Sequence, residues 1–202
     1  MRLRFASAVL LALGVSITAV SAAGLSGMGA NIFGNYFSFP KANIDETPIK
    51  KISVGKMGVV LQQTRLKDLQ KAFGGTIQSQ GEATWLCYHT DDANSWFISN
   101  PLGGQEFVMM VAVQVATGAI PADCEAASAK FSTPDFGAPS LGAKTADLKA
   151  AFGATPGSGG KIAYRHDGPG GYADNAQYLG YMMKGGKVVG LGVGETSIPT
   201  VH

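Results

Sequence analysis

Histidine, cysteine and long apolar runs are scarce in this 202-residue chain, and each scarcity excludes a class of protein. Three histidines, one of them at the C-terminal residue, cannot easily build a histidine-rich zinc site. The sequence contains no HExxH, GxSxG or CxxC motif. Its longest apolar run, Phe5 to Val20, is too short and too rich in Ala, Ser and Thr for a membrane-spanning helix. We therefore expect no membrane span.

Residues 1–23 have the pattern of a secretory signal peptide. Arg2 and Arg4 precede the apolar run, which ends in the small residues Ser21, Ala22 and Ala23. Cleavage there leaves 14 basic and 14 acidic residues, so the mature chain has a net charge of about zero. Because a near-neutral chain without Lys/Arg clusters is poorly suited to phosphate backbones, we expect no nucleic-acid partner. The expected location is the periplasm or the medium.

The two cysteines, Cys87 and Cys124, are an even pair, which in an exported protein usually forms one disulfide. The alternative is two separate buried thiols, and a catalytic thiol is less favoured because nothing nearby marks a base. Glycine, with 28 residues, is at about twice its usual share and indicates many short strands joined by tight turns.

A short phrase occurs twice, as "TRLKDLQKAFGG" at 64–75 and "KTADLKAAFGAT" at 144–155. Each copy predicts a short helix with one apolar face, because the apolar residues recur at spacings of three and four. A glycine should end each helix as its C-cap, and Thr64 and Thr145 are expected to cap the starts. The apolar faces and stops are Leu66, Leu69, Phe73 and Gly74 in the first copy, and Leu148, Ala151, Phe152 and Gly153 in the second.

Each phrase is followed by the pattern of a hairpin and a third strand, with a period of about 80 residues. The predicted fold class is α+β, with two tandem repeats, each a short helix packed on an antiparallel three- to four-stranded sheet. The predicted strands are 83–90, 95–99 and 105–116 in the first half, and 161–166, 175–184 and 187–195 in the second. The predicted divisions are a signal peptide (1–23), an irregular N-terminal arm (24–48), repeat 1 (49–116), a linker (117–140), repeat 2 (141–196) and a tail (197–202).

Polar side chains that could carry chemistry gather at the hairpin turns. His89, Asp91 and Asp92 could bind a metal, but Asp and Asn favour turns by bonding their own backbone, so a polar turn is the preferred interpretation. Asp91 with Asp92, or Asp167 with Asp174, could form an acid–base pair. Their neighbours are Gly, Asn and Ser, which imply solvent, and a catalytic carboxylate usually needs burial or a charged partner. We expect no metal, no cofactor and no enzyme activity.

Aromatic residues are concentrated on the two hairpins: Trp85, Tyr88, Trp96 and Phe97 on the first, and Tyr164, Tyr178 and Tyr181 on the second. Strand alternation sends some of them beneath the helix and the others to the opposite face of the sheet. Aromatic side chains on an open sheet face are typical of protein-binding hot spots. Tyr88, Trp96 and Tyr178 are therefore candidate partner contacts.

The repeated helix, glycine stop and aromatic hairpin resemble the beta-lactamase inhibitory protein family, whose repeat is similar to the small outer-membrane assembly lipoproteins of the SmpA/BamE type. In that family two repeats form a concave sheet that grips an enzyme, and hairpin turns insert into its active site. By position, the resemblance implies that Asp91 or Asp92 and Tyr172 would be the inserted residues. This sequence departs from the family in having one expected disulfide in place of one per repeat, an N-terminal arm, and no lipobox.

The expected function is that of an exported, non-enzymatic binding protein that grips a protein partner, including an enzyme that it would inhibit, through the sheet face and the hairpin turns. Two alternatives remain open. One is an envelope structural or assembly factor that acts through the N-terminal arm, and the other is a small-molecule carrier that uses the aromatic face.

Overall fold

A computed structural model of the chain describes residues 24–35, 39–101, 104, 106–153, 160–168 and 173–199. The expected signal peptide, residues 1–23, lies outside these ranges, as does Tyr172. Within them, no helix is both long enough and apolar enough to cross a membrane.

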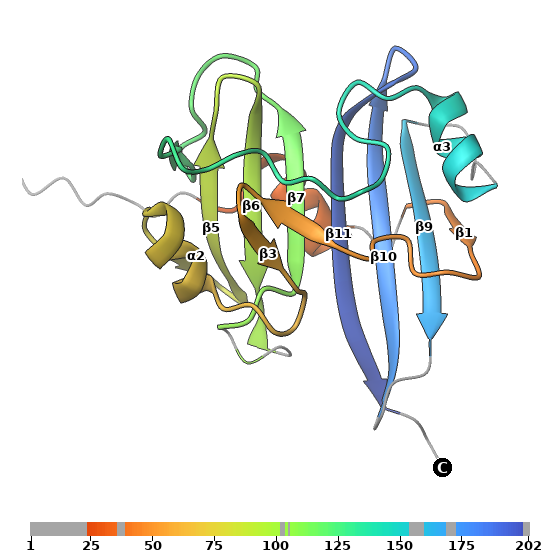
Figure 1. The fold of residues 1–202 in the computed structure, drawn as a ribbon, viewed down its shortest axis with the longest axis horizontal. Coiled ribbons are helices and arrows are strands. Elements are labelled where there is room, and N and C mark those ends of the chain that lie inside the picture. Colours follow the sequence, from red (N-terminus) through yellow and green to blue (C-terminus); the bar gives the residue numbers. More distant parts are fainter. Residues whose placement is uncertain are drawn as a thin grey trace, which may run out of the picture.

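One mixed sheet of nine strands runs through the molecule (Figure 1). Its order is β1-β9-β10-β11-β7-β6-β5-β4, and β8 pairs with β5 beside this path. A separate two-stranded hairpin is formed by β2 (Ile52–Val54) and β3 (Met57–Val59). The sheet strands are β1 (Lys41–Asn43), β4 (Gln78–Gln80), β5 (Ala83–His89), β6 (Ala93–Ser99), β7 (Met110–Val115), β8 (Glu125–Ala126), β9 (Lys161–Gly168), β10 (Ala173–Lys184) and β11 (Lys187–Pro199).

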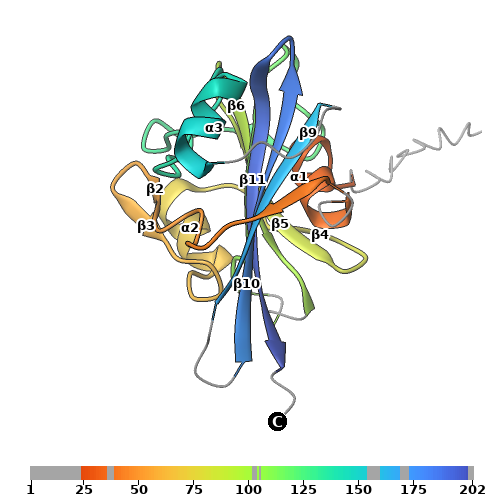
Figure 2. The same cartoon turned by 90° about the vertical axis from the view of Figure 1, so that its right-hand side faces the viewer.

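Helices cover both faces of this sheet. In Figure 2, α2 (Leu66–Phe73), α3 (Thr145–Phe152) and the β2–β3 hairpin lie on one side, which we call the front face. The N-terminal α1 (Gly27–Ala30) and the π-helical turn η1 (Asn31–Asn35) lie on the other, the rear face. The predicted α+β class and the two predicted hairpins, β5–β6 and β9–β10, are confirmed.

Two parts of the chain, which we call units, have similar orders of elements: α2 is followed by β4, β5, β6 and β7, and α3 by β9, β10 and β11. The third strands of the two units, β7 and β11, pair antiparallel at the centre of the sheet. Before each unit lies a short strand that pairs with the other unit: β1 is parallel to β9, and β8 is parallel to β5. The residue after each short strand adds one more hydrogen bond to the same neighbour: Ile44 N donates to Arg165 O at 2.9 Å, and Ala127 N donates to His89 O at 2.8 Å. The two short strands therefore end with the same kind of contact.

The N-cap residues of the two repeated helices, Arg65 and Lys144, each lie one position away from the predicted cap. The α2 helix starts at Leu66, where Asp68 Oδ2 accepts from Arg65 N at 3.3 Å. The corresponding bond at α3 joins Lys144 N to Asp147 Oδ2 at 2.7 Å. The prediction that Thr64 and Thr145 cap these helices is therefore wrong. Thr64 Oγ1 instead accepts from Val60 N at 2.9 Å and closes the preceding turn, and Thr145 is the first helical residue.

The predicted glycine stops are confirmed. Gly74 and Gly153 are the C-cap residues, with φ angles of +83° and +75° that a side chain with a Cβ rarely adopts. Their amides donate to Gln70 O at 2.8 Å and to Lys149 O at 2.9 Å. Each helix therefore ends at the glycine, and the chain turns back toward the sheet.

The larger of the two apolar cores lies on the front face. It includes side chains from the segment that was predicted as a linker. Leu69 and Phe73 of α2 and Leu148 of α3 are buried there. Phe131, from the predicted linker, lies 4.5 Å between ring centroids from Tyr88 on β5. Residues 117–140 are thus partly core, because the chain crosses the front face as it passes from one unit to the other (Figure 1).

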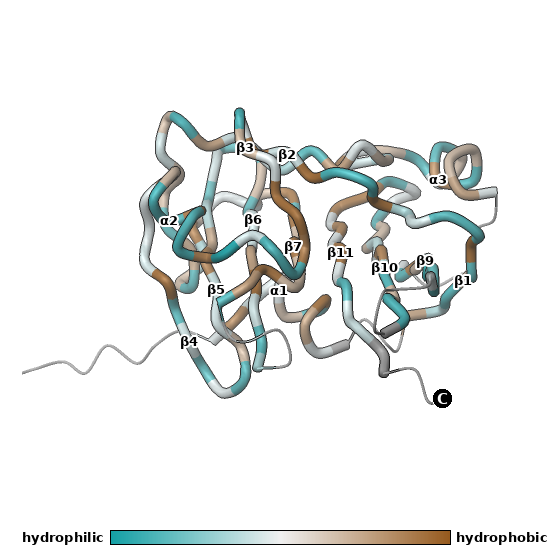
Figure 3. Tube along the Cα trace, turned by 60° about the horizontal axis from the view of Figure 1, so that its bottom comes forward, coloured by the Kyte–Doolittle hydropathy of each residue, from teal (hydrophilic) through white to brown (hydrophobic). Residues whose placement is uncertain are grey.

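The rear face is covered by the segment predicted as an irregular arm. Met28, Ile32 and Phe39 are buried there against Trp96 and the apolar side chains of β5, β6 and β7. Figure 3 shows the hydrophobic stretch of α1 close to β7. The arm prediction is corrected in this respect: the segment forms a helical turn, and its glycines, which weakened any helical pattern in the sequence, permit close contact with the sheet.

The disulfide predicted between Cys87 and Cys124 is present. It joins β5 to the segment between the units across 37 positions of sequence. Closing a loop of about 38 residues contributes on the order of 3–4 kcal/mol to stability on a chain-entropy model. The crosslink therefore fixes the start of the inter-unit segment on the first unit.

Replacing Ile32 tests whether the N-terminal segment belongs to the core. Ile32→Ala should lower the free energy of unfolding by about 2–4 kcal/mol, since it removes a fully buried side chain and leaves a cavity. Urea denaturation at neutral pH measures the loss. Val60→Ala, at a side chain that is 51% exposed, is the control and should change stability by less than about 0.5 kcal/mol. Equal effects of the two substitutions would contradict the core assignment.

The buried tyrosines give a second test of the front core. Burial raises the pKa of Tyr164 to about 12 and also raises that of Tyr181. Tyr181 Oη donates to Pro139 O at 3.0 Å, whereas the Tyr164 hydroxyl has no partner among the described residues. Tyr164→Phe should therefore leave the free energy of unfolding unchanged or raise it, and Tyr181→Phe should lower it by about 1–3 kcal/mol, measured in urea.

The sign of the pH dependence follows from the same shifts. Unfolded tyrosines ionise near pH 10, while the buried ones stay neutral. The tyrosines' contribution to stability should thus be constant below pH 10 and fall as the pH rises toward 12. Phenolate absorbance that appears in the folded protein at pH 10 for every tyrosine would contradict this expectation.

Candidate binding site at the strap

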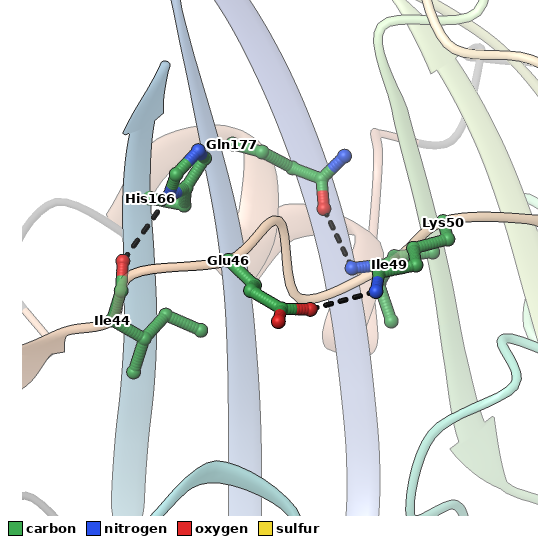
Figure 4. A network of polar contacts seen from close by, with 6 residues as sticks. All are labelled: Ile44, Glu46, Ile49, Lys50, His166 and Gln177. Atoms are coloured by element: carbon green, nitrogen blue, oxygen red, sulfur yellow. Dashed lines mark hydrogen bonds and ion pairs between the residues drawn. The ribbon is translucent and has the colours of Figure 1, made fainter.

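Residues 44–51 form a strap that crosses the front face from β1 to β2 (Figure 4). Two polar contacts hold the strap to the strands beneath it. His166 Nδ1, on β9, lies 3.1 Å from Ile44 O, and Ile49 N donates to Gln177 Oε1, on β10, at 2.8 Å. The strap is therefore fixed at both ends, while Asp45 and Glu46 between these points are exposed.

Grooves flank the strap on both sides. One of about 560 Å³ is bordered by the strap residues Glu46, Thr47 and Lys50 and by sheet residues, and a smaller one of about 250 Å³ continues it toward the β2–β3 hairpin. We call these two together the strap groove; they share Ile49, Lys50, Gln177 and Glu195. A third groove, of about 610 Å³, lies between the strap and α3 and includes Phe136, Pro139 and Phe152.

Gln177 and Glu195 line the strap groove and belong to a chain of hydrogen-bonded polar side chains. Gln177 Nε2 donates to Glu195 Oε2 at 3.0 Å, and Gln62 Nε2 donates to Glu195 Oε1 at 2.9 Å. Ser197 Oγ lies 2.9 Å from Gln62 Oε1 and 3.1 Å from Asn175 Oδ1. Gln177 is only 5% exposed, so its orientation is set by the protein and not by solvent. We call these five residues the strap network.

Gln62 is the one non-glycine residue among those described that has a positive φ, at +62°. A left-handed conformation costs a residue with a Cβ of order 1 kcal/mol or more, and such strain persists where surrounding contacts fix it. Here Gln62 N donates to Val108 O at 2.8 Å, and the side chain is held by Glu195 and Ser197. The turn before α2 thus directs the Gln62 amide at Glu195, which lines the groove.

The strand register places the network in two rows. His166, Gln177 and Glu195 are opposite one another on β9, β10 and β11. Asn175 and Ser197 are opposite one another in the next row on the same face. Along a strand, residues two apart are separated by about 6.8 Å, which is also the two-residue repeat of an extended peptide. The two rows of the network are therefore about one such repeat apart, and the first row, with His166, Gln177 and Glu195, borders the groove.

Charge at the rim of the groove comes from the strap itself. Lys50 Nζ lies 2.7 Å from Glu46 Oε2, and this hydrogen bond and charge hold the pKa of the Glu46 carboxyl below its usual range. Both side chains are largely exposed, so the pair adds little to stability. It places one acidic and one basic group beside Gln177 and Glu195.

Three of the predicted partner contacts are buried in the chain's own core. Tyr88 is 1% exposed and packs on the front face, where its hydroxyl donates to Gly74 O at 2.8 Å. Trp96 and Tyr178 lie beneath the rear covering, at 0% and 2% exposure. The predicted open aromatic sheet face is corrected accordingly, because α2 covers one side of it and the N-terminal segment the other.

The two predicted hairpin turns lie at opposite ends of the sheet. Asp91 and Asp92 are exposed between β5 and β6. Antiparallel pairing through β6, β7, β11 and β10 puts the end of β9, at Gly168, and the start of β10 at the other end. Tyr172, in the second turn, is outside the described residues, but the flanking strand ends cannot meet the first turn. Insertion of both turns into one small site, as the resemblance implied, does not fit this topology.

No group of three or more metal-ligating side chains occurs in the described part of the chain. His89, which sequence reasoning placed beside Asp91 and Asp92, has its Nδ1 2.7 Å from Asn94 Oδ1. The position of His89 is thus explained by a cross-strand contact within the hairpin.

The chain matches no protein-family model, no curated protein and no solved structure. The resemblance to the beta-lactamase inhibitory protein family therefore stays a prediction from short motifs.

Sequence reasoning missed the strap network. Gln62, Gln177 and Glu195 are far apart in the chain, and none belongs to a recognisable motif. The available signal was alternation: Asn175, Gln177 and Glu195, Ser197 are polar residues at every second position of strands that are otherwise apolar on that face.

Gln177→Glu tests the network. The new carboxylate can still accept from Ile49 N but faces Glu195, so we expect a loss of about 1–3 kcal/mol in the free energy of unfolding at pH 7. A like charge raises the pKa of one carboxyl of such a pair, so the loss should shrink as the pH falls toward 4. Urea denaturation of variant and wild type at both pH values measures this.

The matched control is Gln63→Glu, at an exposed neighbour of the network. It should alter stability by less than about 0.5 kcal/mol at either pH. A Gln177→Glu loss that does not depend on pH would show that the network is not a site of charge repulsion.

Proposed function

We propose that this chain is an exported binding protein that holds an extended segment of a protein partner in the strap groove. The supporting observation is the strap network, a fixed row of amide, carboxylate and hydroxyl groups that includes the strained Gln62. Groups that are already oriented lose little entropy when they bind, which favours affinity.

A polypeptide suits this groove better than a small apolar ligand. Pockets for small molecules are mostly apolar with a few polar groups, whereas the 560 Å³ groove is bordered mainly by charged and amide side chains. An extended chain carries an N–H or C=O group on alternating sides, and amide and carboxylate side chains can bind both. The adjacent Lys50 and Glu46 can select the charge of the partner's side chains.

Export is part of the proposal and is supported by the disulfide, since such crosslinks persist in oxidising compartments. We also propose that the two units are copies of one ancestral unit. Matching hydrogen bonds favour this: Val108 N donates to Thr64 O, and Val188 N donates to Ala143 O, both at 2.8 Å. These bonds tie the residue two positions before each helix to the start of the third strand, at Val108 just before β7 and at Val188 in β11.

Quantitative capture from the periplasm or medium of the source cells tests the proposed function. The tagged double variant Glu46→Ala/Lys50→Ala changes only exposed groove side chains, so it should fold normally. We expect it to recover the main partner at least tenfold less than wild type. This corresponds to about 1.4 kcal/mol of binding free energy.

Asp91→Ala/Asp92→Ala is the matched control, because it removes two exposed charges at the far end of the first hairpin. It should recover the partner as wild type does. If only this control lost the partner, the binding site would be at the hairpin turn and not at the strap groove. If all three proteins recovered the partner equally, neither place would be the binding site.

A further inference from the structure

A fully buried carboxylate joins three distant parts of the chain. Asp123, at 0% exposure, accepts from Ser26 N at 2.9 Å, from Ser26 Oγ at 2.6 Å and from Trp96 Nε1 at 2.9 Å. It makes no ion pair with any described residue. Its charge is therefore balanced by these hydrogen bonds, two of which come from the residue just before α1.

The segment that Ser26 anchors fits the rear face closely. A Cβ on Gly29 would lie 2.7 Å from Trp96 Cγ, so only glycine allows this approach. Ile32 fills the space above Gly192, where a Cβ would be 2.9 Å from Ile32 Cγ1. Every close fit of this kind requires the segment to be held in one position, and Asp123 is its polar anchor.

The position of Asp123 depends on the adjacent disulfide. Cys124 is bonded to Cys87 on β5, a strand in the interior of the sheet. The other restraints on this segment are hydrogen bonds. Gln78 Nε2 donates to Asp123 O at 2.9 Å, Thr76 N donates to Glu125 Oε1 at 3.1 Å, and the two-residue strand β8 pairs with β5. The disulfide is the one covalent restraint, and it lies next to Asp123.

We propose that the Cys87–Cys124 disulfide is a redox latch for the N-terminal segment, acting through Asp123. A dithiol reductant transfers two electrons and two protons: its thiolate attacks the disulfide, a mixed disulfide forms, and its second thiol completes the exchange. The products are two protein thiols and an oxidised reductant. Asp123 then moves into solvent with its loop, Ser26 and Trp96 lose their acceptor, and residues 24–35 leave the rear face.

The consequence is a surface that exists only in the reduced protein. Release uncovers the apolar rear face around Trp96, Met110 and Ala112, which the segment covers in the oxidised protein. The front core is not involved, because α2 and α3 pack on the opposite side of the sheet (Figure 2).

Amide hydrogen exchange of the full chain, oxidised and after treatment with dithiothreitol, tests the latch. The acceleration caused by reduction should be at least tenfold larger for the amides of residues 28–31 than for those of 70–74, at the end of α2, because loss of the crosslink affects α2 only through global stability. Unchanged rates at 28–31 would overturn the proposal. Equal acceleration in both regions would also overturn it, since the disulfide would then support the whole fold.

Two variants examine the role of Asp123 without reduction. Asp123→Asn keeps the size of the side chain but replaces one acceptor oxygen by a donor, so it should accelerate exchange at 28–31 at least tenfold with the disulfide intact. Asp135→Asn is the control, because Asp135 accepts only from Gly137 N within its own turn among the side-chain bonds described, and it should match wild type. If Asp123→Asn exchanges as wild type does, the carboxylate is not the link and the proposal fails.

Discussion

The antiparallel pairing of β7 with β11 is the contact on which the rest of the structure depends. It joins Met110–Gln114 to Gly190–Gly194 and connects strands β4 to β7 with strands β9 to β11 in one continuous sheet. Only a continuous sheet gives the front face enough width for two helices, a hairpin and the strap. The same pairing brings Gln62, which precedes the first unit's helix, within reach of Glu195 on the second unit's last strand.

Glycine residues on β11 make the packing on the front face of the sheet different from the packing on the rear face. On the front, Leu191 and Val193 contribute side chains to the main core. On the rear, Gly190 and Gly192 contribute none, and the N-terminal segment supplies the missing volume with Met28 and Ile32. Close packing leaves few voids in protein interiors, so a strand with glycine at alternate positions requires a cover of matching shape. The glycines of β11 and the N-terminal segment that covers them therefore depend on each other for close packing.

Local patterns in the sequence were sufficient to predict the two helices and the two hairpins. Helical spacing around Leu69 and Leu148, the glycine stops and the turn residues between β5 and β6 are all signals within about a dozen positions. The cap prediction failed at Thr64 because its hydroxyl had two possible partners, and a local bond from the amide of Val60, four positions earlier, prevailed. The N-terminal segment was not predicted as helical because its glycines oppose a helix locally, while contact with Trp96 requires them. The strap network could not be predicted from the sequence, because Gln62 and Glu195 are far apart in the chain and come into contact only when the sheet has formed.

The exchange of β1 and β8 between the units has a mechanical consequence. If the two units were pulled apart across the sheet, breaking the β7–β11 ladder would not separate them. The chain before the first unit would still be bound to β9 through Lys41–Asn43, and the segment before the second unit would still be bound to β5 beside the disulfide. Separation would require rupture at three places, so the two halves of the molecule behave under load as one interlocked body.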